Sequence, residues 1–229
     1  QLVLDEPLAA AVLDRFVLRD ASATRTIGGG RFLDLRAPER RRRSPERLAQ
    51  LAALSNFDPA DALQALLAVP PYHADLDGFV RDRALGPGAA ENLSNRLDLV
   101  RIGPLALLPA HWQVLAQAAT ERLDALHAEH PDLPGMGLER LRFAVAPRWP
   151  APLFRQALAR LAEDGVLVPA GSWLRRPGHE ARLLPEDEAL WERIAPLIAE
   201  GERFRPPRVR DIGQMLGRRP VADRGPQGV

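Results

Sequence analysis

The sequence contains no cysteine and no lysine, and its apolar runs are short. Without cysteine the chain can form neither a disulfide nor a thiolate zinc site. Without lysine it cannot carry the G-x-x-x-x-G-K-[ST] loop, in which the lysine reaches the phosphates of a bound nucleotide. No apolar run approaches the ~18 residues that a membrane-spanning helix needs, and the first residues do not resemble a signal peptide. The sequence therefore predicts neither a GTP site nor a membrane segment, and the cytoplasm is the default compartment.

Leucine, alanine and arginine dominate what the chain does contain. Hydrophobic residues make up 46% of the 229 residues and charged residues 27%, which is an ordinary soluble composition. The scarcity of Ile, Phe and Tyr beside abundant Leu and Ala favours small helical domains over a large β-sandwich. The length allows more than one domain, because domains typically have roughly 100–200 residues.

Positive charge is concentrated in two segments. Residues 36–47 hold six Arg and two Glu, and residues 201–229 hold seven Arg and three acidic residues, although the net charge of the chain is only +1. Two basic segments on a mildly acidic body indicate contact with a polyanion at particular places. Solvated Arg side chains on linkers would give the same pattern, so both interpretations stay open.

The first 35 residues have a β pattern. Residues 15–19 and 24–27 are expected to form two strands around a turn at 20–23, and the glycines at 28–30 to bend the chain into 31–33. A phosphate loop is the weaker interpretation of these glycines, since no helix follows them. An isolated hairpin is only marginally stable in water. We therefore expect the end of a β-barrel, in a chain that begins within a longer protein.

A pattern of three amphipathic helices followed by a β-hairpin then occurs twice. The first copy has expected helices near 58–67, 76–80 and 89–97 and a hairpin at 99–108. The second has expected helices near 111–130, 138–144 and 152–163 and a hairpin at 166–175. This order of elements is typical of a winged helix. A third copy begins at residue 186 and breaks off after two helices.

The expected fold class is therefore mainly α with small β-hairpins, as tandem winged-helix domains preceded by the last strands of a β-barrel. Ser44 and Pro45 have the pattern of a helix start in the linker. The expected divisions are a barrel end at 1–35, an Arg-rich linker and helix at 36–55, winged helices at 56–110 and 111–185, a partial winged helix at 186–217, and a disordered tail at 218–229.

No group of residues suggests catalysis. The sequence has no G-x-S-x-G elbow, and the acidic run 186–188 stands at a helix start, where it favours the helix dipole. His127 and His130 lie one helical turn apart, but a metal site needs three or four ligands with supporting contacts. A His near a helix C-terminus already fits the dipole. We expect no catalytic residue, no metal and no cofactor in this chain.

Contact with nucleic acid is the remaining candidate activity. The third helix and the wing of such modules commonly meet nucleic acid, and a phosphate contact needs only an Arg nearby. The candidates are Arg96, Arg155 and Arg160 on the third helices, Arg175 on the second wing, and Arg40, Arg41, Arg42 and Arg43 in the linker. Asn92, Asn95, Gln156 and Arg176 are their neighbours. Each is also an ordinary solvent-facing residue, and the sequence does not decide between the two roles.

The segment Arg15–Gly30 resembles the last hairpin of the third domain of translation elongation factors. It carries their R-F-x-(hydrophobic)-R signature followed by R-T-x-G-x-G, with Arg25 opening the second part. With its longer turn, triple glycine and Arg-rich linker it is similar to the bacterial SelB family of selenocysteine-specific elongation factors. In that family a row of winged helices follows the barrel, and residues 130–136 resemble part of the second one. The resemblance covers residues 1–217, and the tail departs from it.

The resemblance implies a role within a larger protein. The family is a GTPase that carries selenocysteyl-tRNA to the ribosome and recognises an mRNA hairpin chiefly with its last winged helix; GTP and Mg are held by an N-terminal domain. The likeness makes Arg25 and the turn at 20–24 candidate neighbours of the tRNA. For this chain it implies a monomeric, cytoplasmic, RNA-contacting spacer without catalysis of its own.

Two other functions stay open. A winged-helix DNA-binding regulator would explain the repeats but not the hairpin at residues 15–30. An array of rigid spacers that binds no nucleic acid would need only the packing.

Overall fold

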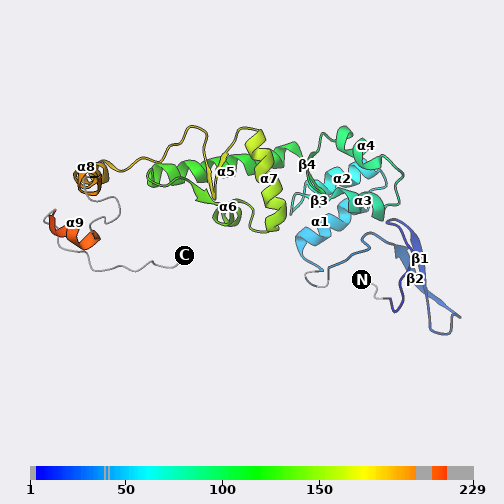
Figure 1. Ribbon diagram of the computed structural model, residues 1–229. Coiled ribbons are helices and arrows are strands. Elements are labelled where there is room, and N and C mark those ends of the chain that lie inside the picture. The colour runs from blue at the N-terminus through cyan, green and yellow to red at the C-terminus, as the bar shows by residue number, and fades with distance from the viewer. Residues whose placement is uncertain (1–3, 39, 41, 200–207, 216–229) are drawn as a thin grey trace.

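The computed structural model of the chain describes residues 4–38, 40, 42–199 and 208–215. Their elements form a row (Figure 1), with a β-hairpin at one end, two helical units with small sheets in the middle, and two helices at the far end. The last two helices are α8 (Pro185–Ala199) and α9 (Val209–Met215). Arg41 and the tail at 218–229 lie outside the described residues.

The N-terminal hairpin pairs β1 (Arg15–Arg19) with β2 (Thr26–Arg31) in antiparallel register. The expectation that the glycines at 28–30 bend the chain is wrong, because they continue β2. Their lack of a side chain has another reason: a Cβ at Gly30 would lie 2.8 Å from the ring of Phe16 on the facing strand. Glycine inside a strand often marks such a close approach.

The first unit, which we call the first winged helix, follows the linker. It contains α1 (Pro45–Leu54), α2 (Pro59–Leu67), β3 (Ala74–Asp75), α3 (Leu76–Asp82), α4 (Ala89–Arg96), β4 (Val100–Ile102) and β5 (Leu105–Leu107). Ser44 and Asp58 accept backbone N–H bonds at the starts of α1 and α2, each just before a proline. These are strong helix-start residues, and the predicted N-cap Ser44 is confirmed.

The second unit, the second winged helix, repeats the order that the first has from α2 onward. It contains α5 (Pro109–Glu129), β6 (Met136–Gly137), α6 (Leu138–Val145), α7 (Ala151–Glu163), β7 (Val168–Ala170) and β8 (Trp173–Arg175). The predicted helices and wing hairpins of both units are confirmed. The sequence did not reveal β3 and β6, because a strand of two residues has no period. Each becomes a strand only by pairing with the wing, in the orders β3-β5-β4 and β6-β8-β7.

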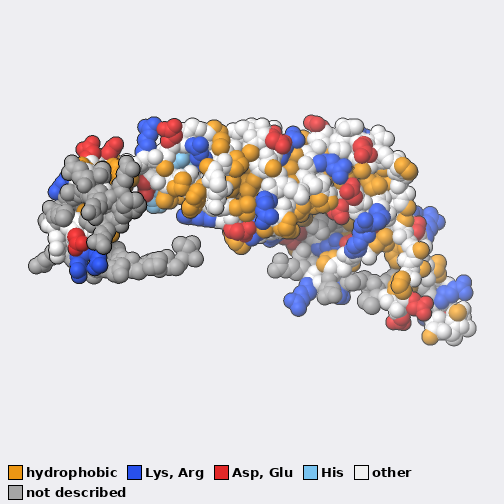
Figure 2. All heavy atoms as spheres, in the orientation of Figure 1, with side chains coloured by type: hydrophobic (Ala, Val, Ile, Leu, Met, Phe, Trp, Pro, Cys, Tyr) orange, Lys and Arg blue, Asp and Glu red, His pale blue; other side chains and the backbone are white. Residues whose placement is uncertain are grey.

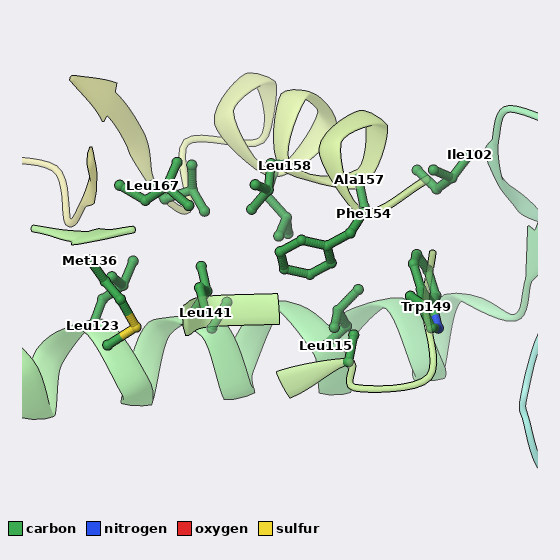
Figure 3. Packing of buried hydrophobic residues seen from close by; sticks show 14 of the residues in the cluster. Ile102, Leu115, Leu123, Met136, Leu141, Trp149, Phe154, Ala157, Leu158 and Leu167 are labelled. Atoms are coloured by element: carbon green, nitrogen blue, oxygen red, sulfur yellow. The ribbon is translucent and has the colours of Figure 1, made fainter. Parts of the chain in front are cut away.

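Each winged helix has its own cluster of buried hydrophobic residues. The first cluster includes Leu63, Leu67, Leu76, Phe79 and Leu93. The second surrounds Phe154 of α7, with Leu115, Leu123, Leu141, Leu158 and Leu161 among its members, as Figure 3 shows for part of the cluster. The helical spacing of these residues is the one from which the helices were predicted.

The β4–β5 hairpin belongs to both clusters. Ala106 is buried in the first cluster, whereas Ile102 and Leu107 are buried in the second. Successive side chains of a strand point to opposite faces, so the wing of the first winged helix lies between the two cores. Figure 3 shows Ile102 at the end of the second cluster, near Trp149 and Phe154. The two winged helices are therefore joined through packed hydrophobic side chains.

Aromatic contacts add to this junction. The rings of Tyr72 and His111 lie 4.4 Å apart, and His73 meets Trp149 edge to face at 5.4 Å. Burial lowers the pKa of His73, so its imidazole is neutral at neutral pH. The loop after α2 thus packs against residues that belong to the second winged helix.

Candidate nucleic-acid interface

The turn between β1 and β2 is ordered by the carboxylate of Asp20. Its Oδ1 accepts the backbone N–H groups of Thr24 at 2.8 Å and Arg25 at 3.1 Å, and its Oδ2 accepts the Thr24 hydroxyl at 3.0 Å. The bond from the Arg25 backbone, followed by that from the Thr24 side chain, lowers the pKa of Asp20. Arg25 is exposed on this ordered turn, and its contact with tRNA stays a prediction.

The Arg-rich linker is attached to the first winged helix by two ion pairs. Arg36 forms a bidentate pair with Asp82, in which Nη2 lies 2.6 Å from Oδ1. The Arg47 Nη2 atom lies 2.5 Å from Asp34 Oδ2. One arginine of the linker, Arg36, and one of α1, Arg47, therefore hold this segment in place.

Other arginines of the linker face solvent. Arg40, Arg42 and Arg43 are exposed, and the last two line a groove of about 660 Å³ bordered by the linker and the hairpin. Arg40 and Arg43 satisfy the first requirement for phosphate contact, which is an accessible guanidinium.

The third helix of the first winged helix, α4, has an open outer face. Asn92, Asn95 and Arg96 are all exposed. The Arg96 guanidinium lies 3.6 Å from Asp58 at the start of α2. The backbone N–H of Asp61 is the main cause of a lowered pKa at Asp58, so this carboxylate is ionised and offsets the charge of Arg96.

The third helix of the second winged helix, α7, is partly covered. A Cβ at Gly103, in the β4–β5 turn, would collide with the amide oxygen of Gln156 on α7. A helix that reads a groove needs that face free, so Gln156 is a junction residue here. Arg160 pairs with Asp164 at 3.2 Å. Arg155 is exposed, and the described part of the chain offers it no ion pair.

Arg175 at the end of β8 and Arg176 directly after it hold the chain that leaves the second wing. The Arg175 guanidinium donates to the carbonyl of His179. Arg176 Nε lies 3.0 Å from Asp124 Oδ1, and its Nη1 donates to the carbonyl of Val166 at 2.5 Å. RNA contact by Arg175 stays a prediction, and its guanidinium already has a partner within the chain.

His127 stacks on His179, with ring centroids 3.5 Å apart and planes at 18°. His127 Nε2 accepts the backbone N–H of Arg176 at 3.3 Å, and His179 Nε2 lies 2.9 Å from the carbonyl of Leu133. Burial, and then the neighbouring His179, lower the pKa of His127. Around this pair, as elsewhere in the described residues, no three possible metal ligands gather. The stack is a structural contact at the end of α5.

The fold defines the chain as a tandem winged-helix protein preceded by a β-hairpin of barrel type. Residues 1–39 match the family described as the β-barrel domain of selenocysteine-specific elongation factor, and residues 120–175 match the winged helix of elongation factor SelB. None of the described helices has the length and apolar character to cross a membrane.

Two curated relatives carry the same name, selenocysteine-specific elongation factor. The protein from Escherichia coli is 33% identical over 221 residues, which are 95% of this chain and 34% of the relative. The protein from Haemophilus influenzae is 25% identical over 191 residues, which are 83% of this chain and 31% of the relative. The chain belongs to the SelB family, as the part with the barrel end and winged helices. It spans about a third of the length of these relatives, and the matches cover no GTPase domain.

Proposed function

We propose that this chain is the RNA-contacting spacer of a selenocysteine-specific elongation factor. In the whole factor, GTP and Mg would be bound outside these residues, and selenocysteyl-tRNA would be delivered to the ribosome at an mRNA hairpin. The chain would connect the barrel, which lies next to the tRNA, with the part that holds the mRNA. We also propose that the protein is a monomer and acts in the cytoplasm.

The observation that supports this role is the shared packing of the two winged helices. Ile102 and Leu107 belong to the wing of the first and are buried in the core of the second. Domains move relative to each other unless their interface is large and hydrophobic. A spacer that sets the distance between two bound RNAs needs such a stiff connection.

The DNA-binding regulator is less compatible with this packing. A regulator would place the third helix of each module in a major groove. In the second winged helix the wing of its neighbour stands against Gln156 on that helix. In the first, Asp58 offsets the charge of Arg96.

Binding of the chain to labelled nucleic acids tests the proposal. We expect purified residues 1–229 to bind a tRNA or a structured mRNA hairpin, with an association constant whose logarithm falls linearly with the logarithm of salt concentration. A duplex DNA should bind more weakly and without base preference. Absence of RNA binding at low salt, or a base-specific footprint on duplex DNA, would contradict the proposal.

A further inference from the structure

We propose that α6 and the turn after it form the RNA-contacting surface of the second winged helix. Arg140, Arg148 and Arg155 would meet RNA phosphates, and the exposed ring of Phe143 would stack on an unpaired base. This inference rests on the proposed function and states where on the chain the RNA is held. Of these residues, only Arg155 stood out in the sequence.

The first observation is a difference of charge between equivalent segments. Residues 138–155, from the start of α6 into α7, contain four Arg and one Glu and have a net charge of +3. Residues 76–93, from the start of α3 into α4, contain two Arg and three acidic residues and have a net charge of −1. The fold is the same in both segments. Only the segment of the second winged helix, residues 138–155, has a positive net charge, and this charge exceeds the +1 of the whole chain.

The second observation is that this surplus is not cancelled locally. Arg142 takes up the one carboxylate, with Nε and Nη2 at 2.9 and 2.7 Å from Glu139 Oε2. Arg140, Arg148 and Arg155 are exposed, and among the described residues none has an ion-pair partner. A guanidinium without a carboxylate partner can donate two parallel N–H bonds to two oxygens of a phosphate.

The third observation is that the surface is held rigidly. The Arg142 Nη1 atom donates to the carbonyl of Trp149 at 2.8 Å and ties the turn to α6. Trp149 is only 8% exposed and packs in the second core. Arg148 precedes this anchored residue directly. Side chains presented from a fixed backbone lose less entropy when they bind.

An aromatic ring lies on the same side of α6. Arg140, Phe143 and Ala144 follow at intervals of three and four residues, which places them on one face of the helix. Phe143 is 61% exposed, and the Arg142 guanidinium lies 4.2 Å from the centre of its ring. Unpaired RNA bases stack on such exposed rings. Figure 2 shows basic and hydrophobic side chains together over the region of α6 and α7.

The covered face of α7 explains why the contact moves to α6. Gln156 is directed at Gly103 of the neighbouring wing, so α7 cannot enter a groove with that face. Arg155, the preceding residue, is exposed like Gln156, but no carboxylate among the described residues pairs with it. The second winged helix would therefore hold RNA by its second helix, the turn and the first half of its third helix.

Two triple variants of residues 1–229 test this surface. The first is Arg140→Gln, Arg148→Gln and Arg155→Gln. The matched control, Arg81→Gln, Arg101→Gln and Arg182→Gln, removes the same charge at three positions where the Arg stands beside a carboxylate. We expect the first variant to lose more than about tenfold in affinity for a structured RNA at 0.1 M salt, and its salt slope to shrink by about 1 per lost contact. The control should keep its slope.

The remaining outcomes separate this inference from the proposed function. If the unchanged chain binds no RNA, the proposed function fails. If it binds RNA and both triple variants lose affinity equally, net charge is responsible and this surface is refuted. Unchanged RNA binding by the first variant also refutes it and leaves an acidic protein as the partner of these arginines. The corresponding triple Lys variant keeps the charge and should retain most of the affinity.

Phe143→Ala tests the stacking contact. It should weaken binding of a hairpin with an unpaired loop by about fivefold or more, since stacking of a base contributes ~1–3 kcal/mol. Binding of a fully paired RNA of the same stem should stay unchanged. Equal binding of the two RNAs by both proteins would exclude stacking on Phe143. Thermal unfolding monitored by circular dichroism should show that all these variants remain folded.

Discussion

The first winged helix is joined to its two neighbours in different ways. Toward the β1–β2 hairpin and its linker the contact is polar, with the pairs Arg36–Asp82 and Arg47–Asp34. Toward the second winged helix it is hydrophobic, with the β4–β5 hairpin buried between two cores. Both junctions connect units that follow one another in the chain, yet one contact is polar and the other is hydrophobic.

The difference indicates where the chain can bend. The Arg36 side chain is 57% exposed, so its ion pair contributes little free energy and weakens as salt rises, while the Arg47–Asp34 pair is mostly buried. Buried apolar area, in contrast, gives stiffness that salt does not screen. We therefore expect motion between the hairpin and the first winged helix, while the two winged helices move as one body. Four measurements test this difference between the two junctions.

The largest effect is expected for Ile102→Ala at the hydrophobic junction. Ile102 is 3% exposed and packs in the second core although it belongs to the first winged helix. Its truncation should lower the free energy of unfolding by about 2–5 kcal/mol, measured by chemical denaturation. Val17→Ala, at a position that is 65% exposed, should change it by less than about 0.5 kcal/mol. A similarly small change for Ile102→Ala would mean that the wing is not part of the second core.

A smaller and more local effect is expected for Asp34→Asn at the polar junction. Loss of the charged hydrogen bond to Arg47 should weaken attachment of the linker by about 1–3 kcal/mol. Hydrogen exchange should then become faster in residues 10–38 and stay unchanged in α5 and α7. Asp132→Asn, at an exposed aspartate in the loop after α5, is the control. Raised salt should loosen the wild-type linker in the same direction, and equal acceleration in α7 would contradict the distinction between the junctions.

Gly103→Ala should destabilise the hydrophobic junction by about 1–2 kcal/mol. The backbone of Gly103 is left-handed, with φ of +56°, which costs other residues about 1–2 kcal/mol, and the added Cβ would meet Gln156. Thermal unfolding of the single variants and of the double variant with Gln156→Ala separates the two causes. The loss of stability in the double variant is compared with the sum of the losses in the two single variants. If the two are equal, the contact between Gly103 and Gln156 does not contribute to the effect.

The smallest effect is a pH dependence of the same junction. Burial lowers the pKa of His73 below the ordinary value of 6.5, so the unfolded chain binds the proton more readily than the folded one. The free energy of unfolding should therefore fall as the pH drops below about 6.5. His73→Phe keeps an aromatic ring beside Trp149 and should flatten the pH profile of the free energy of unfolding. Because the pKa of His127 is also lowered, this variant should keep part of the pH dependence. An unchanged profile would argue against a buried neutral His73.

Much of the fold could be predicted from local patterns. Leu63 and Leu67, or Leu158 and Leu161, recur at helical spacing, and Ser44 with Pro45 marks a helix start, so the helices followed from neighbouring residues. The wings followed from alternating side chains around turns. The triple glycine was misjudged because glycine has the same local meaning in a bend and in a strand that its partner approaches closely.

The candidate interface was less accessible to sequence reasoning. The arginine candidates were chosen by their place on third helices and wings, without knowledge of their partners. Arg96, Arg160 and Arg175 turn out to have partners within the chain. Arg140 and Arg148 lie on elements that the general rule for winged helices does not favour. That no carboxylate among the described residues pairs with them could be seen only in the structure.

Arg155 and Gln156 show the boundary between the two kinds of information. Helical spacing alone placed both on the polar side of α7, because that spacing depends on residues within a few turns. Both are exposed, but Gln156 also lies against Gly103, some fifty residues earlier in the chain. The family, the helices and the absence of a nucleotide loop could be read from residue types and their order. The joining of the two winged helices, and with it the surface left for RNA, arises from packing between segments that are distant in sequence.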